Sequence, residues 1–315
     1  MAQDLVDRVN RRGFLECMGW AGTGALFTLS GGIASSTMIE RAIAAPRASV
    51  PAVTPFSFVQ ISDTHIGFSK PANMDVAATL RETIDKIRAL AHQPDFIIHT
   101  GDITHLATPE QFDLAAQLIG EIGIPVRFVP GEHDIINGND PRPYIERFAK
   151  GSMGNGWYSF DAKGVHFVAL VNVLQFVDSG TGKLGADQLE WLKNDLAGLS
   201  SSTPIVVLSH FPLWPLYPQW GWGTSDGAAA LALLRRFGSV TCLNGHIHQI
   251  QQKIEGHVVF HAARSTAYPQ PAPGVGPGPG PLVVPPEQLR SAIGLTSLEV
   301  RGIATPIPVT DTTLA

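Results

Sequence analysis

From residue 51 onward, short apolar runs alternate with longer stretches in which apolar residues recur at helical spacing. A short, nearly continuous apolar run predicts a strand that is buried on both faces. We expect such strands at 56–61, 96–99, 126–129, 165–171, 205–208 and 240–243. We expect helices between them at 76–91, 109–122, 186–199 and 227–237. This alternation predicts an α/β domain.

Residues 269–286 interrupt the pattern because they consist largely of proline and glycine. Proline lacks the backbone donor that a helix interior or a central strand needs, so neither is expected here. Strand character returns at 295–300, and we interpret 269–286 as a long surface loop between two strands. The chain has 315 residues, which is enough for one large core, and we expect 45–315 to form a single domain.

The first 44 residues predict an export signal. Arg11-Arg12, followed by Phe14-Leu15, precedes a run of apolar and small residues at 18–33, and Ala42-Ile43-Ala44 fits a cleavage site. A membrane-anchoring helix is the alternative, but the run is short and interrupted by glycines. The segment resembles a twin-arginine signal. This implies transport by the twin-arginine export machinery, removal of residues 1–44 and a periplasmic or extracellular location without a stable membrane anchor.

Charge and cysteine content narrow the possible partners. The chain carries 22 basic and 27 acidic residues, for a formal net charge of -5. Because there is no basic surplus, we do not expect nucleic acid or an anionic membrane as a partner. The two cysteines are Cys17 and Cys242, so removal of the signal would leave one thiol and no intrachain disulfide.

Polar clusters follow five of the predicted strands. They are Asp63-Thr64-His65, Gly101-Asp102, Gly131-Glu132-His133-Asp134, His210 and Gly245-His246-Ile247-His248. Loops at the strand ends of α/β sheets converge on one crevice, so we expect these clusters to meet.

The metal-binding side chains in these clusters are carboxylates and imidazoles. They belong to Asp63, His65, Asp102, Glu132, His210, His246 and His248. This mixture suits two first-row metal ions better than Mg²⁺ or Ca²⁺, and two such ions about 3.5–4 Å apart can share a carboxylate. Any one of these motifs alone is common, and a lone histidine is more often structural. The ordered set, with each member after a strand, predicts a binuclear metal site.

With these residues the chain resembles the calcineurin-like metallophosphoesterases over about residues 56–248. It is nearest to the branch that contains cyclic-nucleotide phosphodiesterases and purple acid phosphatases. The resemblance implies a four-layer α/β/β/α sandwich of two mixed sheets flanked by helices. It also implies a hydrolase with two metal ions, such as Mn, Fe or Zn, that cleaves a small phosphodiester or phosphomonoester by attack of a metal-bound hydroxide.

The resemblance assigns a role to each residue of the clusters. One metal would be held by Asp63, His65 and His248, and the other by Glu132, His210 and His246. Asp102 would bridge the two metals, His133 would be the general acid beside the leaving group, and Asp134 would orient His133.

Two positions depart from the family pattern. The family usually has Asn where this chain has Glu132, which can still be a ligand but adds a negative charge. The alternative is that Glu132 disables the second site and leaves a metal-binding or ligand-binding protein with weak catalysis. His105 stands where purple acid phosphatases carry a metal-binding Tyr, and it is either an extra ligand or an ordinary loop residue. A purple-acid-phosphatase-like monoesterase is the other functional alternative.

An aromatic segment follows His210 and is the candidate substrate-binding segment. Its rings come from Trp214, Tyr217, Trp220 and Trp222. Two interpretations are open at this point. The rings could form a wall that stacks on a substrate, or they could pack on the domain as parts of a stiff loop.

Overall fold

The computed structural model describes residues 25–30, 33–38, 53–136, 140–177, 180–302 and 307–315. The chain divides into two compact units, residues 1–50 and residues 51–315. In the first unit, β1 (Ala25–Ser30) and β2 (Ile33–Met38) pair as an antiparallel hairpin. The Arg11-Arg12 pair and the Ala42-Ile43-Ala44 site lie outside the described residues, so the export signal stays a prediction. No helix in the described ranges has both the length and the apolar character needed to cross a membrane.

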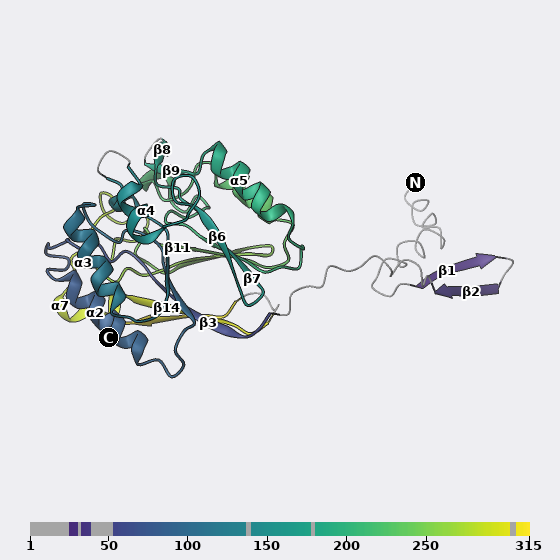
Figure 1. Cartoon of the computed structure of the whole chain (residues 1–315), viewed down its shortest axis with the longest axis horizontal. Coiled ribbons are helices and arrows are strands. Elements are labelled where there is room, and N and C mark those ends of the chain that lie inside the picture. Colours follow the sequence, from purple (N-terminus) through teal and green to yellow (C-terminus); the bar gives the residue numbers. More distant parts are fainter. Residues whose placement is uncertain (1–24, 31–32, 39–52, 137–139, 178–179, 303–306) are drawn as a thin grey trace, which may run out of the picture. The chain divides into compact units, whose positions relative to one another are not determined.

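In the described part of the second unit, two mixed β-sheets form the centre (Figure 1). The first runs in the order β15 (Val309–Thr313), β14 (Gly294–Val300), β3 (Phe56–Ile61), β4 (Phe96–His99), β5 (Val126–Phe128). The second runs in the order β12 (Gln251–Glu255), β13 (Val258–Ala262), β11 (Val240–Asn244), β10 (Ile205–Leu208), β7 (Val165–Ala169), β6 (Tyr158–Ala162). In the first sheet β3, β4 and β5 are parallel, and in the second sheet β13, β11, β10 and β7 are parallel, so several carboxyl ends of strands meet at one edge.

Apolar side chains fill the spaces between the layers. Alternating residues of β3 face opposite sides of the sheet. Phe56 and Phe58 enter the core between the two sheets, whereas Val59 and Ile61 pack in the core beneath the helices. The rings of Phe58 and Phe167 meet edge to face in the inter-sheet core, with 5.5 Å between their centroids. Because both faces of β3 are buried, its sequence is a nearly continuous apolar run.

Helices cover the outer faces of both sheets. The first sheet packs with α2 (Val76–Arg88), α3 (Pro109–Gly120) and α4 (Arg142–Phe148). The second sheet packs with α5 (Ala186–Ala197) and α6 (Gly227–Leu234). The short helix α7 (Pro286–Ala292) lies beside β15. The predicted four-layer α/β/β/α sandwich is confirmed.

Several boundaries and elements differ from the sequence prediction. The four predicted helices end earlier than expected, at residues 88, 120, 197 and 234. Residues such as Ile122 and Phe237 continue the apolar pattern because they are buried, although they lie in the turn after the helix. The sequence also missed α4, α7, the edge strands β6, β12 and β15, the inner strand β13, and the hairpin of β8 (Gln175–Val177) and β9 (Thr181–Lys183). Residues 269–285 form the expected loop, but α7 intervenes before β14.

Candidate metal centre

The seven predicted ligands lie in loops at the carboxyl ends of strands from both sheets. Asp63 and His65 follow β3, Asp102 follows β4, Glu132 opens the one-turn helix η1 (Glu132–Asp134) after β5, His210 follows β10, and His246 and His248 follow β11. Candidate ligands from loops of both sheets therefore meet at one site.

One group of ligands consists of Asp63, His65 and His248, whose donor atoms all lie within 4.8 Å of one another. His248 Nε2 is 3.3 Å from Asp63 Oδ1 and 3.2 Å from His65 Nε2. Burial, with the charges of neighbouring histidines, lowers the pKa of His65 well below its usual range. His65 is therefore neutral at physiological pH and has a lone pair to offer.

A second group consists of Glu132, His210 and His246, whose donor atoms also lie within 4.8 Å of one another. Glu132 Oε2 is 2.8 Å from His210 Nε2, and Glu132 Oε1 is 3.0 Å from His246 Nδ1. Burial disfavours the charged carboxylate, but His246 and His210 hold the pKa of Glu132 well below its usual range. Glu132 thus faces both imidazoles of this group as an ionised carboxylate.

Asp102 lies between the two groups. Its Oδ2 is 3.5 Å from His65 Nε2 and 3.4 Å from His210 Nε2, so one oxygen faces a member of each group. Its Oδ1 accepts a hydrogen bond of 2.9 Å from the backbone N–H of His133. One carboxylate oxygen is therefore held by the protein while the other is shared between the groups.

The backbone around the ligands is unusual. Within the described residues, five of the seven non-glycine residues with positive φ are predicted ligands, namely Asp63, His65, Asp102, His246 and His248. Such conformations are strained for side-chain-bearing residues and cluster at functional sites. The neighbouring glycines make room for the ligands. A Cβ on Gly131 would lie 2.0 Å from Asp102 Oδ1, and one on Gly245 would lie 2.6 Å from Asp63 Oδ2.

Backbone carbonyls orient two of the imidazoles. The Nδ1 of His210 lies 2.6 Å from the carbonyl oxygen of Thr100, and the Nδ1 of His248 lies 2.6 Å from that of Tyr268. A carbonyl oxygen only accepts, so each Nδ1 carries the proton and donates it. Each Nε2 is then left as the nitrogen that can bind a metal, which is the usual supporting arrangement of metal-binding histidines.

Buried polar atoms without hydrogen-bond partners show that the cluster fits metal ions. Within the described part of the chain these atoms include Asp63 Oδ2, Glu132 Oε2 and His210 Nε2. Glu132 Oε2 and His210 Nε2 are close, but their geometry is not that of a hydrogen bond. Unpaired buried polar atoms are costly and rare. Cations between these donors would satisfy them, so the residues present fit two metal ions.

His133 and Asp134 lie beside the cluster, with partners that differ in part from the expectation. The Nδ1 of His133 lies 2.7 Å from the carbonyl oxygen of His105, so this carbonyl orients the ring. Asp134 was expected to do so. Its carboxylate instead accepts hydrogen bonds from the backbone of Ile103, Thr104 and Gly131 and from the Thr104 hydroxyl. Asp134 therefore ties the loop of Asp102 to η1, and burial with the nearby Asp102 charge raises its pKa to about 6.

His105 lies against the general-acid candidate. Its ring stacks on the His133 ring with 4.8 Å between centroids and 17° between planes. It offers a donor atom within 4.8 Å of those of His65 and His133. Burial, with the charges of His133 and Lys70, lowers the pKa of His105 to about 4, so the ring is neutral at physiological pH. Both interpretations of His105, extra ligand and loop residue, remain compatible with this position.

The four rings of the aromatic segment differ in role, because some fit a substrate wall and others pack on the domain. Trp220 lines the pocket over the cluster and therefore fits a substrate wall. Trp222 is fully buried beside Ile247, and Trp214 packs on the Phe260 ring at 5.7 Å. Tyr217 packs on the edge of Trp220 at 5.3 Å. Three of the four candidates are thus packing residues, because the loop folds its rings onto the domain.

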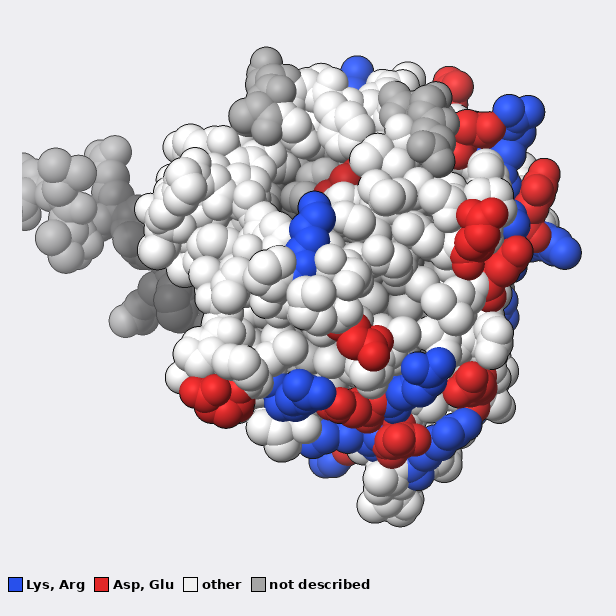
Figure 2. Space-filling view, turned by 90° about the vertical axis from the view of Figure 1, so that its left-hand side faces the viewer, with Lys and Arg blue, Asp and Glu red and all other residues white. Residues whose placement is uncertain are grey.

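A pocket of about 250 Å³ opens over the two ligand groups. Figure 2 shows a hollow surrounded mostly by uncharged residues, with an acidic group inside it and a basic side chain at its edge. Besides the candidate ligands, the other histidines and Trp220, the pocket is lined by Phe68, Lys70, Tyr268, Gln270 and residues 279–281. These residues were not predicted from the sequence because they belong to no motif. For Gln270 and residues 279–281, the one available signal in the sequence was the proline–glycine composition of 269–286, which predicts a surface loop.

Comparison with known proteins identifies the family. The calcineurin-like phosphoesterase family matches residues 56–250. The chain is 24% identical over 220 residues to a 3′,5′-cyclic-nucleotide phosphodiesterase of Nostoc sp., covering 68% of this chain and 79% of that protein. It is 27% identical over 210 residues to the glycerophosphodiester phosphodiesterase GpdQ of Enterobacter lignolyticus, covering 60% of this chain and 70% of that protein.

The fold also matches that of a solved phosphatase structure. The crystal structure of a dimetal phosphatase from Danio rerio matches with a TM-score of 0.61 and 17% identity, covering 82% of this chain and 99% of that one. The architecture, the ligand cluster and the family match over more than half of the chain agree. The chain belongs to the calcineurin-like phosphoesterases and is a metallophosphoesterase.

Proposed function

We propose that the protein is an exported hydrolase that uses a binuclear metal centre to cleave phosphoester bonds in a small phosphodiester or phosphomonoester. The observation that carries the proposal is the pair of ligand groups on either side of Asp102, each of which combines carboxylate and imidazole donors. This donor set suits Mn, Fe or Zn.

Asp63, His65 and His248 would hold one ion, and Glu132, His210 and His246 the other, with Asp102 shared. Bound there, two ions would neutralise charge on the phosphoryl group and supply a nucleophile from water at neutral pH. No protein nucleophile is needed. The thiol of Cys242 is buried, and burial raises its pKa above the usual range, which makes it a poor nucleophile.

His133 would donate a proton to the leaving oxygen. Because its Nδ1 is held by the His105 carbonyl, Nε2 is the nitrogen that can exchange a proton with substrate. Burial by itself lowers the pKa of His133, but the charges of Asp102 and Glu132 outweigh this effect and raise the pKa. The ring therefore keeps its proton more readily than an ordinary histidine, as a general acid should.

Two relatives named as phosphodiesterases support a diester as the preferred substrate. A purple-acid-phosphatase-like monoesterase is the runner-up, but His105 stands where those enzymes have their ferric-binding tyrosine. A binding protein disabled at the second site is less well supported, because the Glu132 carboxylate lies 2.8 Å from His210 Nε2 and 3.0 Å from His246 Nδ1, where one ion could contact all three.

The test is a comparison of bis(4-nitrophenyl) phosphate with 4-nitrophenyl phosphate as substrates of the metal-loaded protein. We expect hydrolysis of both, with higher kcat/KM for the diester. Asp102→Ala should abolish turnover and lower the metal content at both sites, whereas Asp187→Ala, an exposed acid on α5, should change neither. Failure to hydrolyse either substrate would contradict the proposal, and a faster monoester would favour the runner-up.

Export is the second part of the proposal and rests on Arg11-Arg12 and Ala42-Ile43-Ala44. Protein recovered from the extracytoplasmic fraction should begin near Ala45 by amino-terminal sequencing. Replacement of Arg11-Arg12 by two lysines should leave full-length protein in the cytoplasm. Recovery of an extracytoplasmic protein with an intact Met1 would contradict cleavage.

A further inference from the structure

We propose that Lys70 is a specificity-determining residue that binds a negatively charged group on the leaving-group arm of the substrate. The preferred substrates would then carry a second anion beyond the scissile phosphate. The inference rests on the proposed function, because it refines the substrate class of the same site.

Lys70 supplies an unneutralised positive charge to the pocket. Among the pocket-lining residues of the described chain it is the one Lys or Arg. Its side chain is exposed, and its ammonium lies 5.9 Å from the centroid of the Phe68 ring. It forms no ion pair within the ranges that the structure describes. An anion that binds there would therefore not have to displace a carboxylate.

A row of rings leads from the general-acid candidate to this ammonium. His133 stacks on His105 at 4.8 Å, and His105 meets Phe68 edge to face at 5.1 Å, measured between ring centroids. The Lys70 ammonium lies 5.9 Å from the centroid of the Phe68 ring, and all four residues line the same pocket. A leaving group that takes a proton from His133 would extend along these rings toward Lys70. The charge is therefore placed to act on the leaving-group arm.

The backbone of Lys70 is fixed by a tight turn. The N–H of Asn73 donates to the carbonyl of Lys70 at 2.9 Å. The buried side chain of Asn73 donates to the carbonyl of Ala267 at 2.7 Å and to the hydroxyl of Thr79 at 3.1 Å. The turn is thus anchored to α2 and to the segment after β13. Only the side chain of Lys70 remains free to reach a ligand.

The proline–glycine loop that lines part of the pocket offers no competing charge. Residues 269–286 contain no Lys, Arg, Asp or Glu. Gln270 holds part of this loop over the pocket, because it donates to the carbonyl of His246 at 2.8 Å and accepts from the N–H of Gly280 at 3.1 Å. Apart from the candidate metal ligands and the histidines, Lys70 is the one charged residue that lines the pocket in the described chain, so charge selection at the leaving-group arm depends on Lys70.

The experiment uses two substrates that differ by one charge on the leaving group. These are methyl 4-nitrophenyl phosphate and methyl 3-carboxy-4-nitrophenyl phosphate, both of which release a coloured phenolate. We expect kcat/KM of the metal-loaded enzyme to favour the carboxylated substrate about fivefold to tenfold, between the effects of an exposed ion pair and of a hydrogen bond to a charged group. Lys70→Met should abolish the preference and Lys70→Glu should reverse it. The preference should weaken with added salt.

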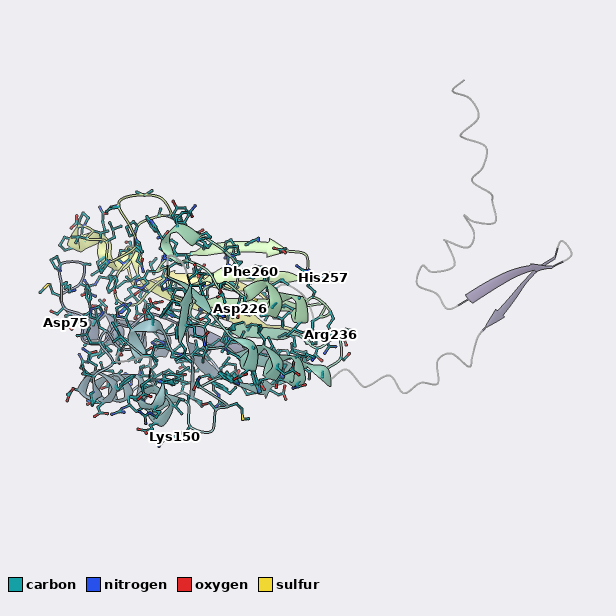
Figure 3. The ribbon with its side chains drawn as sticks, turned by 90° about the horizontal axis from the view of Figure 1, so that it is seen from above. Asp75, Lys150, Asp226, Arg236, His257 and Phe260 are labelled. Carbon is teal, nitrogen blue, oxygen red and sulfur yellow. The ribbon has the colours of Figure 1, made fainter. Side chains whose placement is uncertain are left out.

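Lys150→Met is the matched control, because it removes the same charge outside the pocket lining. Figure 3 labels Lys150 at the edge of the domain, apart from Asp75, which lies shortly after the Lys70 turn. This variant should keep the wild-type ratio. If the ratio of kcat/KM between the two substrates in Lys70→Met equals that of the wild type, the inference is overturned, whether or not both values fall.

Binding without turnover separates this inference from the proposed function. Two methyl benzylphosphonates, with and without the carboxylate, replace the leaving oxygen by carbon. Calorimetry should show that metal-loaded wild-type protein binds the carboxylated member about fivefold to tenfold more tightly and that Lys70→Met does not. If neither phosphate ester is hydrolysed, the proposed function fails while calorimetry still decides the role of Lys70. Equal binding of both phosphonates by the wild type would overturn the inference.

Discussion

Glu132→Asn restores the residue that the family usually carries and removes one of the three negative charges of Asp63, Asp102 and Glu132. At an effective dielectric constant of about 20, unit charges 4 Å apart interact by about 4 kcal/mol, and a divalent ion doubles this value. The Asn oxygen can still be a ligand, which offsets part of the loss. We expect the second ion to bind roughly 10²–10³-fold more weakly, or about 3–4 kcal/mol. With metal in excess, diester hydrolysis should be at least as fast as in the parent, because a less negative site repels phosphate less.

The assay is elemental analysis of both proteins after identical loading and desalting, with chelator competition to measure the affinity of the second ion. Glu132→Gln is the matched control, since it keeps the length of the side chain and removes only the charge. The parent should retain two ions, and both variants should lose the second one more readily. One ion in the parent and two in Glu132→Asn would contradict this expectation, because Glu132 would then exclude the second ion rather than bind it.

Three further predictions concern single residues. His133→Ala should keep both metals and lower kcat roughly 10²–10⁴-fold, with a smaller loss for good leaving groups; loss of metal in this variant would contradict the general-acid role. Gly131→Ala places a Cβ 2.0 Å from Asp102 Oδ1 and should lower metal content and cost about 1–3 kcal/mol in denaturant unfolding. His166 Nδ1 lies 2.8 Å from Asp161 Oδ1, and His166 Nε2 lies 2.9 Å from Asp195 Oδ2. Burial opposes its charge, but the two carboxylates raise its pKa above 6.5. The free energy of unfolding of the wild type should therefore exceed that of His166→Asn by about 1–2 kcal/mol below pH 6.5, and this difference should decline as pH rises through the raised pKa. Urea titrations of both proteins at several pH values would measure it.

The sequence was most informative where burial is uniform. The strands β3, β4 and β10 match their predicted ranges because both faces of each are buried and their sequences are continuous or nearly continuous apolar runs. β12 escaped because it is an outer strand whose sequence, Gln251–Glu255, is mostly polar. The short helices α4 and α7 were not predicted because prolines lie in their first turns and they are too short to show a clear helical period of apolar residues.

The candidate site shows the same division. Its seven candidate ligands were predictable because each stands in a motif at a strand end, and the structure brings them together. The partner of Asp134 was not predictable, since its hydrogen bonds run to backbone groups of Ile103 and Gly131 that no side-chain pattern reveals. Lys70 escaped because its position depends on the turn fixed by Asn73, and a lone lysine after a strand is an ordinary surface residue.

We propose that this chain binds two metal ions that share Asp102. Crystals of the protein loaded with Mn or Zn, measured at the absorption edge of the metal, test this directly. We expect two anomalous difference peaks about 3.5–4 Å apart. One should lie among Asp63, His65 and His248, and the other among Glu132, His210 and His246, with Asp102 between them. A single peak, or two peaks of which one lies away from Glu132, His210 and His246, would contradict it.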